Sequence, residues 1–485
     1  MHRDGLPVLR FTILFSGGMI MKKSKIAVLL IAVFLILAAC SQSATEEIVP
    51  EYENKVEEAD IDLLGYVYTI AAETHGGGEY QLSPEPGASD RGDRLLQRYK
   101  DTEQKFNVKM DIQDGSSLSM FLTQYAAGLK YADLMISKIA DVFNGKYVQN
   151  GYFMAFSDMD IDLDSGLYGT PGTLEAGSFG NKYYSIVAYY WGFPTPYTMP
   201  AMWFNPRVIS EYSQTSPHEL NEQGSWTWAT LESMCEAIHD TSDPNSDMHT
   251  YALAYTSEPY LEFAALFSNG ARVVTKNADG RLEYTLNSRE AIEAMDFVQS
   301  LASRDLICDG GDRQNITPFV ENRRAFFLEF THLGLSTDGT NNLAYQMQDA
   351  YEWIYFPTGP SGDPKSTQRS AYSYHSRIFY APMNSDAEVH SLLLPYLLQP
   401  LPGETKDTWQ DVLKRNNFYT DESFEYFRMI RDEAFYDYTP FIPFSDYQGK
   451  LLQITRGRAA ASEVFESIAQ QYQSSLDSLY NDYLD

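Results

Sequence analysis

Apolar and polar positions follow two different periods along the first half of the chain. Short apolar runs typical of buried strands occupy 63–68, 108–112 and 132–136, whereas 94–106 and 118–129 carry the 3.6-residue period of amphipathic helices. Strands and helices that alternate at this spacing predict an α/β domain with a parallel sheet. Ligands of such sheets bind beyond the carboxyl ends of the strands, so the loops that follow these runs are candidate binding segments.

Later helices show their own start signals. Thr227 stands before an apolar helix face that carries Cys235, and we expect this cysteine to be a small buried apolar residue. Ser385 and Glu388 have the spacing of a capping box ahead of another apolar run. An amphipathic pattern over 462–483 predicts a helix near the end of the chain.

The first part of the chain carries a targeting signal. Three lysines precede an apolar run over 26–39, which is too short to cross a bilayer of about 30 Å as a helix. A Leu-Ala-Ala triplet then leads into Cys40 and resembles the lipobox of bacterial lipoproteins. That resemblance implies cleavage of a signal peptide, residues 1–39, and attachment of diacylglycerol to Cys40. The expected start is Met21, with Met19 as the alternative, and a short transmembrane anchor is the alternative for the apolar run. The acidic segment 40–59 is predicted to be a flexible tether.

Composition narrows the class of ligand. The 485 residues include 36 Lys and Arg against 66 Asp and Glu, a net charge of −30, which argues against binding to nucleic acid. Apolar residues make up 44% of the chain, ample for buried cores. The 35 tyrosines, 27 phenylalanines and 6 tryptophans exceed ordinary core needs and indicate a ligand that aromatic rings contact.

Catalytic and metal-binding motifs do not explain the chain. A nucleophile elbow, a His-Glu-x-x-His helix, a phosphate-binding lysine loop and a Cys-x-x-Cys pair are all missing from the sequence. The acidic run from Asp158 to Gly166 lacks the turn glycine and the final glutamate of a calcium loop. We therefore expect no metal and no cofactor. Paired carboxylates of a glycoside hydrolase stay open, because their separation is set in three dimensions.

Six short motifs follow one another along most of the chain: Gly-Asn-Lys-Tyr-Tyr at Gly180, Met-Trp-Phe-Asn-Pro at Met202, the helix start from Pro217 to Trp228, Phe-Val-Glu-Asn-Arg at Phe319, Phe-Pro-Thr-Gly-Pro at Phe356, and Arg-Gly-Arg at Arg456. In this order they resemble the bacterial extracellular solute-binding proteins of ABC transporters, the maltose-binding proteins among them. A further segment, Glu-Pro-Tyr at Glu258, resembles the Glu-Pro-Tyr of maltose-binding proteins.

The resemblance implies a type II periplasmic-binding-protein fold, in which two α/β lobes built from discontinuous segments are joined by crossing strands. The first lobe is expected to comprise 60–186 and 376–440, and the second lobe 187–375 and 441–485. The chain is expected to cross between the lobes near Ile186, between Tyr374 and Tyr380, and near Pro440.

The same resemblance implies a function without chemistry of its own. A lipid-anchored monomer on the outer face of the cell membrane would capture a carbohydrate, an oligosaccharide, in its cleft and deliver it to the permease subunits of an importer. A secreted carbohydrate-active enzyme and a sugar-sensing receptor subunit are the alternatives.

Sugar recognition needs aromatic rings against the apolar faces of a pyranose and charged groups on its hydroxyls. The match to Glu-Pro-Tyr implies that Glu258 and Tyr260 touch sugar, with helix packing as the alternative for Tyr260. Three adjacent aromatics at 189–191 cannot all face one core in an extended segment, which makes Trp191 a candidate. A core position is the alternative for Trp191 and His332. Tyr190 is a further candidate from the same aromatic run. The remaining candidates, by position in the family pattern, are Ser137, Asp141, Phe330, His332 and Phe444.

Overall fold

The computed structural model describes most of the chain after the tether: residues 61–72, 82–188, 198–239, 251–255, 259–309, 316–335, 343–372, 376–405 and 407–484. The chain divides into two compact units, Met1–Glu58 and Ala59–Asp485, and everything described here belongs to the second. Among these residues, no helix combines the length and the hydropathy needed to span a bilayer.

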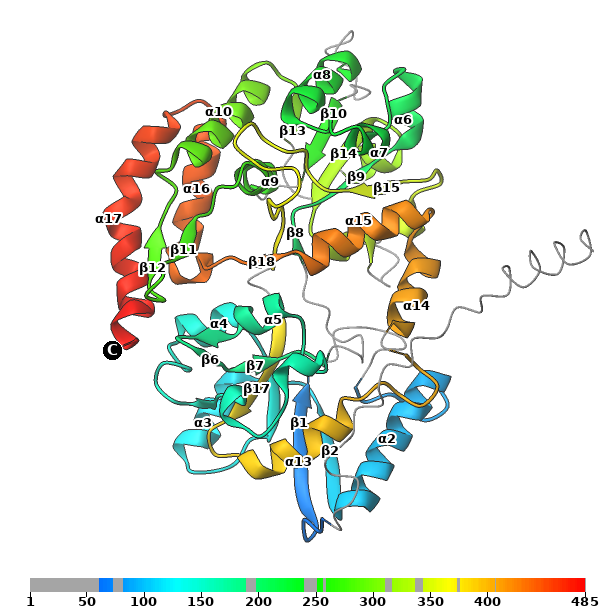
Figure 1. Ribbon diagram of the computed structural model, residues 1–485, viewed down its shortest axis with the longest axis vertical. Coiled ribbons are helices and arrows are strands. Elements are labelled where there is room, and N and C mark those ends of the chain that lie inside the picture. Colours follow the sequence, from blue (N-terminus) through cyan, green and yellow to red (C-terminus); the bar gives the residue numbers. More distant parts are fainter. Residues whose placement is uncertain are drawn as a thin grey trace, which may run out of the picture. The chain divides into compact units, whose positions relative to one another are not determined.

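A six-stranded sheet forms the first lobe (Figure 1). Its parallel strands form from the apolar runs that the sequence predicts. In β1 and β3 consecutive residues are buried, as expected for strands that are covered on both faces. The predicted α/β pairing is confirmed: β1 pairs in parallel with both β2 and β3. The strand order is β2 (Val108–Asp114), β1 (Tyr66–Ala72), β3 (Leu134–Lys138), β17 (Arg377–Pro382) and β4 (Phe153–Met154), with β7 (Ser185–Ile186) paired to β17.

Capped helices surround this sheet. Ser89 caps the helix before β2 by accepting a hydrogen bond from the Gly92 amide, so that the helix begins four residues earlier than its apolar pattern predicts. Ser117 caps the next helix through the Met120 amide. The helices of this lobe are α2 (Asp90–Phe106), α3 (Leu118–Ala126), α4 (Ile139–Asn144), α5 (Pro171–Ala176) and α13 (Ala387–Leu397).

A five-stranded mixed sheet forms the second lobe. Strands β13, β10 and β14 run parallel to one another, whereas β9 pairs in antiparallel fashion with both β14 and β15. The order is β13 (Ile307–Asp309), β10 (Tyr251–Tyr255), β14 (Arg324–Glu329), β9 (Ala201–Phe204) and β15 (Glu352–Ile354).

The second lobe is rich in helices. They include α6 (Pro206–Glu211), α7 (Pro217–Glu222), α8 (Trp228–Ile238), α9 (Tyr260–Ser268), α10 (Arg289–Ser303), α11 (Ile316–Val320), α12 (Leu343–Gln346), α14 (Thr408–Asn417), α15 (Asp421–Asp432), α16 (Phe444–Thr455) and α17 (Ala461–Leu479). A hairpin of β11 (Val274–Lys276) and β12 (Leu282–Tyr284) packs against α17. As predicted, Thr227 caps α8, and Cys235 on that helix is fully buried, which raises the pKa of its thiol to about 12.

A small three-stranded sheet joins the lobes, and we call it the hinge sheet. It consists of β8 (Thr198–Met199), β16 (Ala371–Tyr372) and β18 (Phe435–Tyr436). Between β7 and β9 the chain passes through β8, and between β15 and β17 it passes through β16, close to the first two predicted crossings. In Figure 1, β8 and β18 lie between the two larger sheets.

The third crossing differs from its prediction. We expected it near Pro440, with 376–440 in the first lobe. Instead α13 packs on α2 in the first lobe, whereas α15 packs on β15 of the second. The hydroxyl of Ser423 accepts a hydrogen bond from the Trp353 amide, and Thr420 donates to Glu352. The chain therefore crosses between α13 and α14, because the apolar face of α15 is covered by strand β15.

A second correction concerns the start of α13. Asp386, not Ser385, is its N-cap, because the Asp386 carboxylate accepts from the amides of Glu388 and Val389 at 3.0 and 3.2 Å. The Ser385 hydroxyl is engaged elsewhere, with the Pro382 carbonyl and the His390 ring. The capping-box spacing is present, but one residue out of register with the helix.

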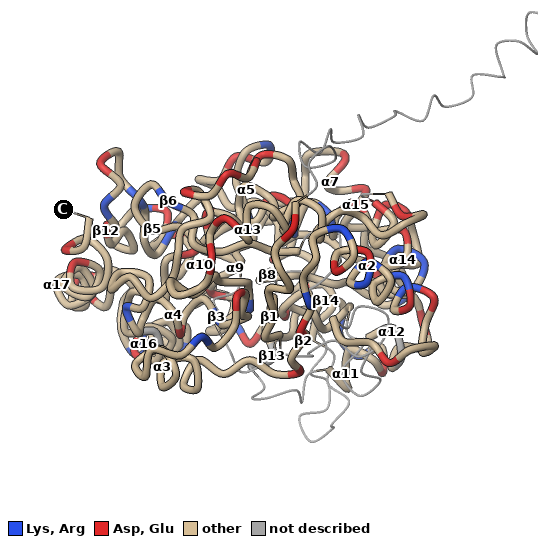
Figure 2. Tube along the Cα trace, turned by 90° about the horizontal axis from the view of Figure 1, so that it is seen from below, with Lys and Arg blue, Asp and Glu red and all other residues tan. Residues whose placement is uncertain are grey.

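Charged positions are spread over the fold, and some of them, such as Asp133 and Glu262, are buried. In Figure 2 the acidic and basic positions are scattered over helices and loops rather than gathered into a basic stripe. Many of them pair locally, as Arg207 does with Glu211 at 2.9 Å and with Asp349 at 3.0 Å. Exposed pairs of this kind contribute little to stability, so the fold rests on its apolar cores.

Candidate ligand-binding site

The first lobe brings Ser137 and Asp141 to the carboxyl end of β3. Ser137 is the fourth residue of that strand, 8% exposed, and lies opposite Ile378 of β17. Asp141 is exposed in the first turn of α4. The Ile139 amide between them donates to the Ser376 carbonyl at 3.1 Å, which ties the start of α4 to the segment that returns from the hinge sheet. Both predicted residues therefore lie beside the second crossing.

The second lobe brings three predicted aromatics together. Tyr260 begins α9, and its ring meets that of Phe330 edge-on, with centroids 5.0 Å apart. Phe330 in turn lies 5.7 Å from the His332 ring. Phe330 and His332 are half-buried, whereas Tyr260 is 4% exposed. We call these three residues the aromatic cluster.

The aromatic cluster adjoins the first crossing. Thr331 stands between Phe330 and His332, and its hydroxyl oxygen accepts a hydrogen bond from the Thr198 amide of β8 at 3.1 Å. Because β8 belongs to the hinge sheet, the cluster is attached to the segment about which the lobes would move. The two sets of predicted residues thus lie at the carboxyl ends of the parallel strands in their sheets, next to the segments where the chain crosses between the lobes.

The side chains of four other candidates are not among those that the structure describes. Tyr190, Trp191 and Glu258 fall outside the described residues, and for Phe444 the structure describes the backbone, at the start of α16, but not the side chain. Their neighbours are described: β8 begins at Thr198, and Pro259 is the N-cap of α9. These four residues remain predictions.

The structure adds polar residues that the sequence reading missed. Glu329 ends β14 at 9% exposure, with its carboxylate accepting from the Phe330 amide at 3.1 Å. Arg377 begins β17 opposite Lys138, and burial lowers the pKa of its guanidinium. Both stand at strand ends beside predicted site residues. The signal that would have found them is the rule that ligands meet the ends of parallel strands.

A buried carboxyl lies in the hinge region. Asp437 directly follows β18 at 3% exposure, and desolvation raises its pKa to about 7. Thr439 and the Arg272 guanidinium favour its charged form, but neither oxygen has a well-formed hydrogen bond within the described part of the chain. The buried hydroxyls of Tyr380 and Tyr436 have no partner among these residues either. Buried polar groups without hydrogen bonds lower the free energy of unfolding, so these groups destabilise the hinge region.

Further contacts connect helices of the first lobe with elements of the second. Glu175 of α5 pairs with Lys276 of β11 at 3.0 Å and accepts a hydrogen bond from the Tyr438 hydroxyl. Phe143 of α4 lies edge-on to Phe441, 5.5 Å between centroids. These contacts combine an ion pair, a hydrogen bond and packed rings, and Phe143 and Phe441 both belong to the buried apolar cluster.

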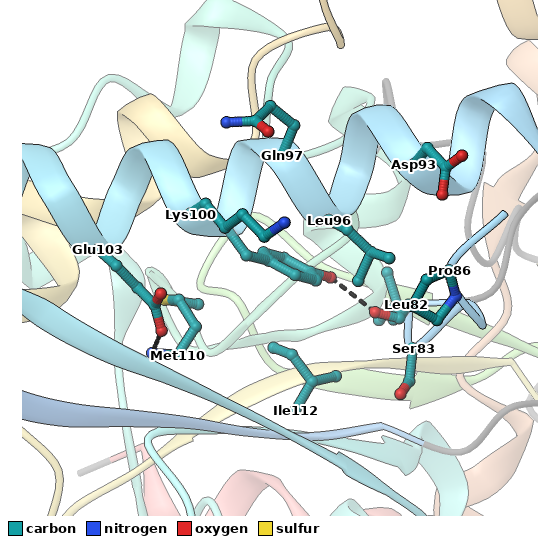
Figure 3. Close-up of a pocket in the computed structure, with 11 residues that line it drawn as sticks. Leu82, Ser83, Pro86, Asp93, Leu96, Gln97, Lys100, Glu103, Met110 and Ile112 are labelled. Atoms are coloured by element: carbon teal, nitrogen blue, oxygen red, sulfur yellow. Dashed lines mark hydrogen bonds between the residues drawn. The ribbon is translucent and has the colours of Figure 1, made fainter.

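Two pockets lie away from the predicted residues. A pocket of about 500 Å³ separates α2 from β2, with Leu96, Met110 and Ile112 on its apolar side (Figure 3). The Tyr99 hydroxyl donates to the Leu82 carbonyl. Figure 3 shows the Glu103 carboxylate accepting a hydrogen bond from the Met110 amide. A second pocket of about 360 Å³ is lined by Arg91, Arg94, Glu404 and Trp409, among others. Neither contains a predicted site residue, so the candidate site rests on the strand ends.

Metal ligands are not gathered anywhere in the described ranges. No group of three or more His, Cys, Asp or Glu side chains there could hold a metal ion. Asp158, in the acidic run that superficially resembles a calcium loop, instead pairs with Lys182 at 2.6 Å.

Comparison with known proteins gives the fold. No protein-family model and no curated protein sequence matches the chain. A cyclo/maltodextrin-binding protein complexed with maltotetraose matches at TM-score 0.58 and 14% identity, over 85% of this chain and 97% of that one. An ABC substrate-binding protein from Listeria monocytogenes, in complex with cycloalternan, matches at TM-score 0.51 and 12% identity, over 85% and 98%.

A third solved structure agrees. The GacH receptor of Streptomyces glaucescens, solved unliganded and with acarbose, matches at TM-score 0.52 and 12% identity, over 87% of this chain and 100% of that one. The chain thus has the two-lobed α/β fold of ABC substrate-binding proteins, and the predicted fold class is confirmed.

Proposed function

We propose that this chain captures an oligosaccharide between its lobes and delivers it to the permease subunits of an ABC importer. One observation carries the proposal. Ser137 and Asp141 on one sheet, and the aromatic cluster on the other, each lie at strand ends tied to a hinge crossing, through Ser376 and Thr198. Polar groups from one lobe and rings from the other are what a sugar with hydroxyl edges and apolar faces requires.

The fold comparisons support the same ligand class. The three similar structures are described with maltotetraose, cycloalternan and acarbose, each a carbohydrate. Two of these proteins are described as a substrate-binding protein of an ABC system and as a receptor, not as enzymes. We propose no catalytic step for this chain.

A thermal-shift screen tests the ligand class. The purified protein is melted with maltotetraose, other linear and cyclic oligosaccharides and monosaccharides, and with amino acids as controls. A ligand that binds only the folded protein adds about 2.7 kcal/mol to the free energy of unfolding at a hundredfold excess over Kd. We expect at least one oligosaccharide to raise the melting temperature. Stabilisation by an amino acid alone, or release of reducing ends from a bound sugar, would contradict the proposal.

We further propose that Cys40 is the lipidated first residue of the mature protein and holds it at the outer face of the cell membrane. The support is the apolar run and the Leu-Ala-Ala-Cys sequence. Replacing the thiol, as in Cys40→Ala, is expected to abolish fatty-acid labelling and leave unprocessed precursor. Cys235→Ala is the matched control, because it removes a buried thiol and should leave labelling intact. Full labelling of the Cys40 variant would refute the anchor.

A further inference from the structure

Four exposed apolar side chains lie at the end of the first sheet where its parallel strands begin, the end remote from the candidate site. Leu64 is 86% exposed, Leu129 58%, Met383 44% and Val67 43%. They come from the turn before β1, the start of β1, the loop before β3 and the end of β17. In Figure 1 this is the end at which β1 begins, and Figure 2 looks at the molecule from that side. We call these four residues the β1 pole.

Hydrogen bonds show that these loops lie side by side. The Lys130 ammonium, next to Leu129, donates to the Val67 carbonyl at 3.1 Å. The Asn384 amide, next to Met383, donates to the Leu129 carbonyl at 3.0 Å. The four side chains therefore share one end of the lobe, whereas isolated exposed apolar residues are ordinary on any protein surface.

Leu64 is unusual in its backbone as well as its exposure. Its φ of 55° lies in the left-handed region, which glycine or asparagine adopts at lower cost than leucine. Its amide is held there by the Asp62 carboxylate at 2.8 Å. Neither solubility nor local conformation favours a leucine at this position. An exposed, strained apolar residue points to a partner that covers it.

Two charged residues that flank the β1 pole, Lys130 and Asp62, already have polar partners. Lys130 contacts the Asp133 carboxylate at 2.9 Å, and Asp62 also accepts from the Asn107 side chain at 2.6 Å. An approaching apolar surface would therefore not have to strip water from an unpaired ion at these two positions. A net charge of −30 in the whole chain disfavours an electrostatic contact with anionic lipid, so the contact would be apolar.

The chain outside the described residues indicates what covers the β1 pole. Ile61 is the first described residue and stands three positions before Leu64, while Cys40 is joined to it by a segment of about 20 residues with a reach of roughly 25 Å. If this segment is a flexible chain, an anchored Cys40 holds the pole at a typical distance of that size from the bilayer, where a weak contact becomes effectively intramolecular. Leucine and methionine side chains enter the headgroup boundary readily.

We propose that the β1 pole is a membrane-contact surface that rests on the interfacial zone of the bilayer, and this proposal rests on the lipid anchor proposed above. The test uses the full lipidated protein, reconstituted into phosphatidylcholine vesicles that contain a doxyl-labelled quencher lipid. A fluorophore is attached at Val67→Cys in a Cys308→Ser background, since Cys235 is buried. Tyr419→Cys, at a 51% exposed aromatic elsewhere, carries the control fluorophore.

We expect the vesicles to quench the fluorophore at Val67 and not the one at Tyr419. Quenching should fall to the control level in Leu64→Ser/Leu129→Ser. It should persist in Met120→Ser/Met429→Ser, which removes two exposed methionines from α3 and α15. Equal quenching at both labelled positions, or quenching that survives the Leu64 and Leu129 changes, would overturn the proposal.

Other occupants of the β1 pole give different results. Shielding of the Val67 fluorophore before vesicles are added, independent of protein concentration, would show that the chain covers its own pole. Concentration-dependent shielding would show a second copy there. Flotation with the vesicles reports the anchor separately: protein that fails to float refutes the anchor and the contact with it, whereas protein that floats without quenching at Val67 refutes the contact alone.

Discussion

At the scale of single residues, exposure separates candidates that the sequence treats alike. Tyr260 and Phe330 touch each other, yet Tyr260 is 4% exposed and Phe330 is half-buried. A ring can contribute to both folding and binding, but its share in each follows the surface it leaves free for a ligand. Phe330 thus has more free ring surface than Tyr260 and is the better candidate for direct stacking on sugar.

Truncation of the two rings should divide accordingly. Phe330→Ala is expected to weaken oligosaccharide binding by about 2 kcal/mol, roughly a thirtyfold rise in Kd, with a modest loss of stability. Tyr260→Ala should lower the free energy of unfolding by about 3–5 kcal/mol, as for a buried aromatic. Calorimetric Kd and denaturant unfolding measure the two effects, with Tyr419→Ala as the exposed control. A native Kd for Phe330→Ala would remove it from the site.

Trp191 carries the same expectation as Phe330, argued from the sequence alone. If its ring faces sugar, Trp191→Ala should raise Kd by a similar factor and leave the melting temperature of the free protein nearly unchanged. A mutant that melts much lower but keeps its affinity in the cold would place Trp191 in the core.

Asp437 makes stability depend on pH. Its pKa is about 7 in the folded protein against 3.8 for a free Asp, so the folded state holds the proton more tightly. Stability is therefore greatest below about pH 4 for this group and declines as pH rises through 7, by at most about 4 kcal/mol. Asp437→Asn should flatten this decline in denaturant unfolding between pH 5 and 8. The exposed Asp279→Asn should not, and a wild-type slope in Asp437→Asn would contradict the burial argument.

At the scale of elements, local signals locate helices better than they locate caps. The period of apolar residues predicts α2, α3, α8 and α17 to within a few residues of their ends. Which polar residue caps a helix depends on where the incoming chain lies. Ser385 was the predicted cap of α13, but its hydroxyl contacts His390, whose pKa burial lowers to about 4, and Asp386 occupies the cap.

Asp386 is the N-cap of α13, so removing its side chain should lower the free energy of unfolding. Asp386→Ala is expected to lower the free energy of unfolding by about 1 kcal/mol. Asp407 is the matched control: it is the N-cap residue of α14 but makes no side-chain capping hydrogen bond, so Asp407→Ala should change stability little. Equal losses in the two variants, measured by denaturant unfolding, would show that the Asp386 contacts to the α13 amides add nothing.

At the scale of the whole molecule, the main feature is the hinge sheet between the two lobes. Two of its three strands, β8 and β16, carry the chain between the lobes, and the contacts outside this sheet include the Glu175–Lys276 ion pair and the Phe143–Phe441 ring pair. Proteins with two lobes commonly close around a ligand by rotation about a few connecting segments. The candidate residues of both lobes stand beside those segments.

We therefore expect sugar to draw the lobes together. Small-angle scattering of the protein, with and without an oligosaccharide identified by thermal shift, should give a smaller radius of gyration at saturation. Phe330→Ala at the same sugar concentration serves as a control of weak occupancy. An unchanged radius with a saturating ligand would mean that binding does not close the lobes.

The order of strands and helices and the two-lobed class are predictable from the sequence, because periodicity and motif order can be read along the chain, whereas the targeting segment stays a prediction. The aromatic residues Tyr260, Phe330 and His332 were predicted from motif positions, and the fold places them in one cluster. Thr198 and Thr331, by contrast, are 133 positions apart, and nothing local shows that they join. Only the tertiary structure decided to which lobe α15 belongs, which residue caps α13, that Asp437 is buried and that the residues of the β1 pole lie together. Each of these depends on partners that folding brings from distant parts of the chain.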